Sequence, residues 1–305
     1  MSWFLVALIS PLAHAAVNHI DKYLLTKYLK NGQVGSLVLF SALFAFVALP
    51  VIALIDPTVF AISATDMVLL MINGLLLVLA YIFYFYALDS DETSIVAPMF
   101  QLVPIFGFIL GYVFLGESLA KNQIAGSIVV IGGAMLLSLN FNSSRVSVKR
   151  KVILFMAMSS ILYAINGVLF KFVAEDVQRF WPSLFWDFAG KGVFGIIIFL
   201  TVASYRNQFL KVLKENRLSI LGLNSFNEIL GLVGEGATVF AVLLAPVALV
   251  QVVSGFQPLF VLLYGIAFTL LFPRISQESL ASKDLLQKCT GIFAIILGTF
   301  IISYL

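Results

Sequence analysis

Long apolar stretches separated by short polar connectors run through almost all of the 305-residue chain. Ten of these stretches are long enough to cross a bilayer, because a transmembrane helix needs about 20 predominantly apolar residues. Asp, Asn, Gly and Pro stand in several connectors, where they favour turns and end helices. The pattern predicts an all-α membrane protein with ten transmembrane helices near 3–23, 33–55, 67–88, 94–115, 124–140, 152–173, 182–204, 219–243, 248–272 and 285–304.

The composition supports a membrane protein and narrows its chemistry. Hydrophobic residues make up 61% of the chain and charged residues 11%, with a mean hydropathy of +1.07. The single cysteine, Cys289, excludes an intramolecular disulfide. The chain has no phosphate-binding loop, no serine-nucleophile elbow and no His/Cys zinc motif. We therefore expect no ATP hydrolysis, no cofactor, no bound metal and no nucleic-acid partner.

The basic residues predict how the chain is oriented. The first stretch contains Ala13-His14-Ala15, which has the form of a signal-peptide cleavage site, but it lacks a basic start and its apolar character continues. We expect it to be retained as the first helix. Alternating connectors place fourteen Lys and Arg residues on one side of the bilayer and two, Lys121 and Arg179, on the other. Because basic connectors stay in the cytoplasm, we predict a multi-pass plasma (inner) membrane protein with both termini on the non-cytoplasmic side.

The two halves of the chain show a weak internal repeat. Residues 154 positions apart match in order, as in Ala87 and Ala241, Val96 and Val250, Pro104 and Pro258, Phe106 and Phe260, and Gly111 and Gly265. Gly126 and Gly133 align with Gly291 and Gly298 once loop insertions are allowed. Five helices per half would invert the second copy in the membrane, as in many transporters. We expect one repeat over 1–145 and a second over 146–305, with generic similarity of apolar helices as the alternative.

Several motifs resemble the EamA-like family of the drug/metabolite transporter superfamily. In the first half they are Tyr86-Ala87-Leu88, Ser94-Ile95-Val96-Ala97-Pro98, Leu102-Val103-Pro104, Leu115-Gly116-Glu117, Gly126 and Gly132-Gly133. The second half is similar but carries Pro273–Glu278 where the family has a short Gly-Glu turn. The resemblance implies ten helices, a central cavity between the halves, and alternating access for a small polar or amphiphilic solute. It makes Glu117 a helix-end residue rather than a ligand.

One predicted helix, 219–243, carries two carboxyl groups in the middle of the bilayer. Asn224, Glu228, Gly231 and Glu235 follow each other at spacings of four, three and four, so they share one face. The two carboxyl groups stand about 10 Å apart along the axis at roughly 1.5 Å per residue. Because charges inside a bilayer are costly, we interpret them as binding the solute or a coupling proton. A pair of structural carboxylates is the alternative.

Other polar residues fall at similar depth. Asp187 and Lys191 lie one turn apart and can pair, either as a structural strut or as part of the site. His14 and Asn18 share one face of the first helix, and Tyr81 aligns with Glu235 across the repeat. The remaining candidates for a polar cavity are Gln101, Tyr163, Asn166, Asn227 and Gln251. The pairs Asp21 with Lys22 and Lys171 with Glu175 are expected as rim charges, with gates as the alternative.

These features favour a secondary active transporter. We expect it to move a small polar, amine-bearing or cationic metabolite by alternating access, driven by a proton or solute gradient, because three intramembrane acidic groups face one Lys. Its partners would be this solute, protons and the lipid bilayer, and it would act as a monomer or a homodimer. The alternative is an intramembrane lipid-modifying enzyme or a lipid flippase, with the carboxyl groups as acid and base.

Overall fold

The computed structural model describes residues 2–27, 34–90, 96–138, 150–215, 218–271 and 282–304, and within them the regular structure is entirely helical. The α-helices are α1 (Ser2–Lys27), α2 (Val34–Ile55), α3 (Ala64–Ser90), α5 (Leu102–Leu115), α6 (Lys121–Ser138), α7 (Arg150–Ala174), α8 (Phe180–Thr201), α9 (Ala203–Glu215), α10 (Leu218–Leu244), α11 (Val247–Val253), α12 (Gln257–Leu271) and α13 (Ser282–Tyr304). The 3-10 helices are η1 (Pro57–Phe60), η2 (Ala97–Gln101), η3 (Val177–Arg179) and η4 (Ser254–Phe256).

Seven helices of the described residues are long and apolar enough to cross a membrane. They are α1, α2, α3, α7, α8, α10 and the continuous run of α11, η4 and α12. Three shorter apolar helices cover 99–115, 121–137 and 287–302, where the sequence predicted the other crossings. The chain is therefore a multi-pass, all-helical membrane protein, and the ten-crossing inverted repeat with its boundary near 145 stays a prediction. Parts of the connectors between the predicted crossings, the segment 273–278 and several of the counted basic residues lie outside the described residues.

Turn-forming residues end the helices as their chemistry predicts. The Asp56 carboxylate accepts the Thr58 N–H at 2.9 Å and so caps η1. Asp176 accepts the Gln178 N–H at 2.8 Å at the start of η3. Gly116 follows α5 with a φ of 66°, a left-handed conformation that favours glycine. The two aspartates thus satisfy backbone N–H groups at the starts of η1 and η3, and Gly116 ends α5.

A further helix occupies a connector that the sequence left irregular. The predicted crossing at 182–204 ends early, at Thr201, and α9 begins at Ala203. Tyr205, Phe209 and Val212 recur at helical spacing, so they form one apolar face beside charged residues. Phe209 stacks edge-on against Phe40 of α2 and Phe199 of α8. The connector is therefore an amphipathic helix packed on the bundle, a type that lies at membrane surfaces.

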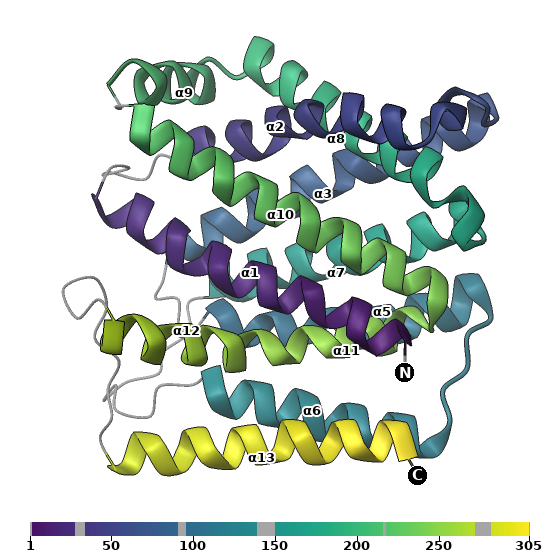
Figure 1. Ribbon diagram of the computed structural model, residues 1–305, viewed down its shortest axis with the longest axis vertical. Coiled ribbons are helices and arrows are strands. Elements are labelled where there is room, and N and C mark those ends of the chain that lie inside the picture. The colour runs from purple at the N-terminus through teal and green to yellow at the C-terminus, as the bar shows by residue number, and fades with distance from the viewer. Residues whose placement is uncertain are drawn as a thin grey trace.

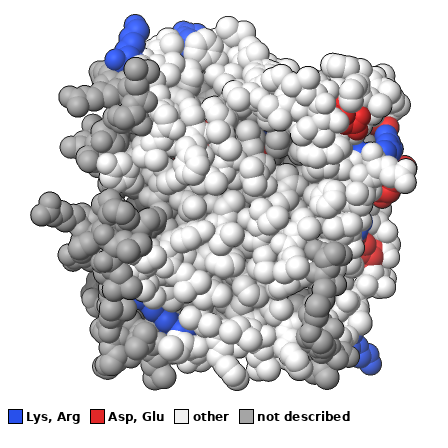
Figure 2. All heavy atoms as spheres, viewed as in Figure 1, with Lys and Arg blue, Asp and Glu red and all other residues white. Residues whose placement is uncertain are grey.

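The helices run across the view of Figure 1, and both termini lie at the same end of the bundle. We refer to this end as the terminus end. Figure 2 shows acidic side chains gathered there and a broad uncharged belt between the two ends of the bundle. Large apolar side chains are exposed along the helices, such as Phe293 of α13 with 66% of its surface accessible. An exposed apolar belt of this extent is what a surface in contact with lipid requires.

Helices α6 and α13 lie side by side and pack through glycines (Figure 1). A Cβ added to Gly126 would lie 2.6 Å from the carbonyl oxygen of Gly298, and one added to Gly133 would lie 2.8 Å from that of Gly291. The internal repeat aligns Gly126 with Gly291 and Gly133 with Gly298. Gly126 therefore contacts the counterpart of Gly133, and Gly133 contacts the counterpart of Gly126. A two-fold axis produces this reciprocal pattern.

Candidate functional site

An ammonium, a carboxylate and a phenol from three helices meet in the interior. Lys191 of α8 is 1% exposed, and its Nζ lies 2.9 Å from both carboxylate oxygens of Glu235 on α10. Tyr81 of α3 donates its hydroxyl to Oε1 of Glu235. The Lys191 Nζ also lies 5.0 Å from the centre of the Tyr81 ring. The cation is thus compensated by Glu235 and further stabilised by the face of the ring.

Asp187 and Lys191 do not pair with each other, as their spacing had suggested, but take separate partners. Asp187 accepts a hydrogen bond from Nδ2 of Asn73 on α3 at 2.8 Å. Asn166 of α7 in turn donates to the backbone carbonyl of Asn73 at 3.4 Å. The reason is tertiary, because Glu235 offers Lys191 two oxygens from the neighbouring helix, while Asn73 offers Asp187 an amide donor.

Two further acidic groups, Glu228 of α10 and Asp21 of α1, lie nearer the start of α10 than Glu235. Glu228 is 8% exposed, and Oγ of Ser41 on α2 donates to its Oε1 at 2.9 Å. The preceding residue, Asn227, donates its Nδ2 to Oδ1 of Asp21 on α1 at 2.7 Å. The sequence suggested that Asp21 is a solvated rim charge, and this is wrong. Helix α1 continues to Lys27, so Asp21 lies well inside the helix, half-buried against α10.

Open space borders α10 between its two carboxyl groups. Gly231 stands between Glu228 and Glu235 on the same face of the helix, and a Cβ added to it would meet no atom within 4 Å. The opposite face, with Phe226, Ile229 and Val233, carries the exposed apolar side chains. The space at Gly231 therefore lies on the interior side of α10.

His14 and Tyr163 border this region from two further helices. Nδ1 of His14 donates to the Ser10 carbonyl oxygen at 2.9 Å. The His14 ring lies against Gly234, since a Cβ added there would be 2.7 Å from the ring. The Tyr163 ring of α7 contacts the Tyr81 ring edge-on with centroids 5.8 Å apart. Asn18 is half-buried one turn beyond His14 on α1.

Two predicted site residues belong to a different contact. A Cβ added to Gly167 of α7 would lie 3.2 Å from Nε2 of Gln251, and the Gln251 amide also fills the space over Gly107 of α5. Gln101, at the end of η2, lies beside Gly255 of η4. The structure therefore places Gln251 between α5, α7 and α11, and Gln101 at the contact between η2 and η4.

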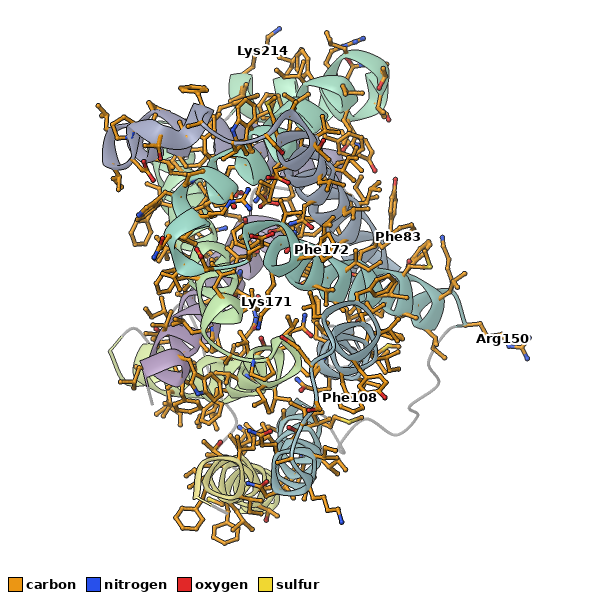
Figure 3. All side chains as sticks on the ribbon, turned by 90° about the vertical axis from the view of Figure 1, so that its right-hand side faces the viewer. Phe83, Phe108, Arg150, Lys171, Phe172 and Lys214 are labelled. Atoms are coloured by element: carbon orange, nitrogen blue, oxygen red, sulfur yellow. The ribbon has the colours of Figure 1, made fainter. Side chains whose placement is uncertain are left out.

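A polar link at the terminus end was missed by sequence reasoning. The Lys171 Nζ lies 2.7 Å from Oε1 of Glu117 and donates to the Ala245 carbonyl oxygen at 2.7 Å. The other Glu117 oxygen accepts the Val247 N–H at 2.8 Å. Figure 3, viewed from the terminus end, shows Lys171 within the bundle. Its suggested partner Glu175 instead lies 3.6 Å from Arg179. The only signal for the link was the Leu115-Gly116-Glu117 motif, which turns Glu117 back toward its helix.

A small apolar hollow lies elsewhere, between α1, α6, α11 and α13. Its lining is Trp3, Phe4, Val130, Leu249, Val252, Val253, Phe256, Thr299 and Ile302. These residues offer one hydroxyl and no charged group, so the hollow is separate from the polar clusters of α10.

Comparison with known proteins identifies the relatives of this chain. Residues 1–139 match the EamA-like transporter family. An uncharacterized protein of Methanocaldococcus jannaschii is 33% identical over 69 residues, which are 23% of this chain and 50% of that protein. The chain thus spans about half the length of this relative. A crystal structure described only as that of a protein aligns with a TM-score of 0.63 at 15% identity, over 99% of this chain and 96% of the other. At this identity the likeness shows a shared fold alone.

Proposed function

Because its first 139 residues match the EamA-like transporter family, we propose that this multi-pass membrane protein is a secondary active transporter. It moves a small polar, amine-bearing metabolite by alternating access, with a proton gradient as the driving force. It resides in the plasma membrane with both termini on the non-cytoplasmic side. The basic helix α9, at the opposite end of the bundle from the termini (Figure 1), supports this orientation.

The observation that carries the proposal is the open space at Gly231 between two buried carboxyl groups. Charged groups inside a bilayer are costly and mark solute or ion sites. Here Gly231 lies between Glu228 and Glu235 on one face of α10, and Glu235 binds Lys191 and Tyr81. Acidic groups outnumber the single Lys in this region, so an amine-bearing solute fits the local charge better than an anion.

Alternating access is supported by the reciprocal contacts of the two halves. Helix α1 packs on α10 and α3 packs on α7, and these are counterparts in the internal repeat. The contact between α3 and α8 and the contact between α2 and α10 are also counterparts, but they differ. Helix α3 packs closely along α8, whereas α2 touches α10 much less. In a two-fold arrangement whose two related helix contacts are unequal, the close contact can open while the loose contact closes. The solute would then reach Gly231 from either side in turn.

The experiment is to fill the space at Gly231. Purified protein is screened by thermal shift against a panel of primary amines and amino acids, since a ligand at 100 times its Kd stabilises by about 2.7 kcal/mol. The stabilising compound is then assayed for uptake into proteoliposomes. We expect Gly231→Leu to fold normally and lose both binding and uptake, because its side chain occupies the solute position.

Gly222→Leu is the matched control. Gly222 lies on the exposed face of the same helix and also has open space around its Cβ position, so this variant should bind and transport like the unchanged protein. Transport that survives in Gly231→Leu would contradict the proposed site. A chemically altered product in place of an accumulated solute would favour an enzyme instead.

A further inference from the structure

Asp21 and Glu228 differ from Glu235 in what binds them. Asp21 is held by the Asn227 amide and Glu228 by the Ser41 hydroxyl. Both partners are neutral, and both can either donate to an ionised carboxylate or accept from a protonated acid. Glu235 is held by the Tyr81 hydroxyl and also by the Lys191 ammonium, which has donors only and contacts both carboxylate oxygens. The partners of Asp21 and Glu228 thus suit both protonation states, whereas the ammonium beside Glu235 suits only the ionised carboxylate.

The balance of charge also separates Asp21 and Glu228 from Glu235. Protonation of Glu235 would leave the buried Lys191 cation without its counter-charge, and an uncompensated buried charge is strongly destabilising. Asn227, which binds Asp21, directly precedes Glu228, so the two carboxyl groups are neighbours and repel each other when both are ionised. Two neighbouring carboxyl groups that repel each other bind and release protons as a pair.

The side-chain oxygen of Asn227 adds an independent observation. Asn227 is 3% exposed, and its Oδ1 has no hydrogen-bond donor among the described residues. A protonated carboxyl group supplies such a donor, since the amide can turn to present its oxygen. Asn227 can therefore bind Asp21 with or without its proton.

We propose that Asp21 and Glu228 form the proton-binding site of this protein, separate from the Glu235–Lys191 pair at the solute position. The inference rests on the proposed transport function. The charged and titratable groups around Glu228 are Asp21 of α1, Tyr81 of α3, Lys191 of α8 and Glu235 of α10, beside the Ser41 hydroxyl of α2. Protons would thus load on the side of α10 that faces α1 and α2.

Among the described residues, Asp187 is also bound by an amide, that of Asn73, and it is buried. Its surroundings differ, because Lys191 faces it from one turn along α8 and the backbones of α3 and α8 are in contact beside it. In the part of the chain that the structure describes, no second carboxyl group with a neutral hydrogen-bond partner lies beside Asp187. We therefore assign Asp187 to the closed α3–α8 contact and not to proton binding.

The test is pH-difference infrared spectroscopy on the purified full-length protein in lipid nanodiscs, which needs no solute. Acidification should produce the carbonyl band of a protonated carboxyl group. Glu228→Gln and Asp21→Asn should each remove or strongly reduce this band. Ser41→Ala, a milder change, should shift the band frequency, because it removes the hydrogen bond to Glu228.

The controls separate this site from the other acids. The charge-neutral double variant Glu235→Gln/Lys191→Met should retain the band. So should Asp66→Asn, because Asp66 lies in an ion pair with Arg179. A band that persists in both Glu228→Gln and Asp21→Asn, or that disappears only in Asp187→Asn, would overturn the assignment. Thermal unfolding of each variant identifies those that fold. A failed uptake assay would count against the transport proposal while leaving this result intact.

Discussion

Lys191 shows how a single residue is defined by its partner. Its cation is almost fully buried, and the two oxygens of Glu235 and the ring of Tyr81 are the groups that compensate it. The Asp187 carboxylate one turn away on the same helix has its own donor in Asn73. Local spacing therefore identified the charged residues of α8 but not the pair that neutralises them.

Removal of one partner of this ion pair should destabilise the protein. Breaking a buried pair leaves an unpaired charge and costs about 3–5 kcal/mol. We expect Lys191→Met to lose about 3 kcal/mol of unfolding free energy by this mechanism. Adding Glu235→Gln should recover most of the loss, since no charge is then left alone. Unfolding by SDS titration in mixed micelles measures both, and equal destabilisation of the single and double variants would refute the charge argument.

At the scale of elements, glycines determine how closely helices approach. A Cβ on Gly74 of α3 would collide with the Asp187 carbonyl oxygen and lie 2.5 Å from the backbone nitrogen of Lys191. A Cβ on Gly190 of α8 would collide with the backbone of Met71. The two backbones touch, and this contact brings Asn73 opposite Asp187. Hydropathy could predict both helices. It could not predict this contact, because a glycine in the sequence does not indicate which helix packs against it.

Gly74→Ala should therefore be destabilising. The obstructing atoms are backbone atoms of α8 and cannot turn away, so the helices must separate, and overpacking of this kind costs about 1–3 kcal/mol. Gly132→Ala is the control, because Gly132 is also helical but its added Cβ meets no atom within 4 Å. That variant should match or slightly exceed the unchanged protein in thermal stability. Equal thermal stability of the two variants would show that the α3–α8 contact is not close-packed.

At the scale of the whole molecule, Glu117 and Lys171 join distant parts of the chain. Glu117 follows α5, Lys171 lies in the last turn of α7, and their backbone partners lie at the junction of α10 and α11. The link ties together segments from both halves at the terminus end. It is well placed to hold this end closed, because any separation of these helices must break it.

A double-mutant cycle of Glu117→Gln and Lys171→Met should show coupling. Both side chains are largely buried, so we expect an interaction free energy of about 1–2 kcal/mol. Glu175 serves as the comparison, since it is 73% exposed in its pair with Arg179, and exposed pairs contribute about 0.5 kcal/mol or less. Unfolding midpoints in detergent provide the free energies. Additive effects of the Glu117 and Lys171 variants would show that the link does not contribute to the stability of the molecule.

Much of the fold and part of the site could be predicted from the sequence. Hydropathy placed the apolar helices, and helical spacing placed Glu228, Gly231 and Glu235 on one face, because both depend only on residues a few positions apart. The amphipathic helix α9 was missed since its apolar face is too narrow to resemble a crossing. The family resemblance was likewise readable, and the match over residues 1–139 confirms it.

The tertiary structure alone decided which of these residues meet. Lys191 binds Glu235 and not Asp187, Lys171 binds Glu117 and not Glu175, and Asp21 turns inward to Asn227. Each of these partners comes from another helix, and several lie far along the chain. Which helix faces which depends on how all of them pack, and above all on where glycines let two backbones touch. No local pattern contains that information, so the sequence determined the elements and their polar faces, and packing determined the site.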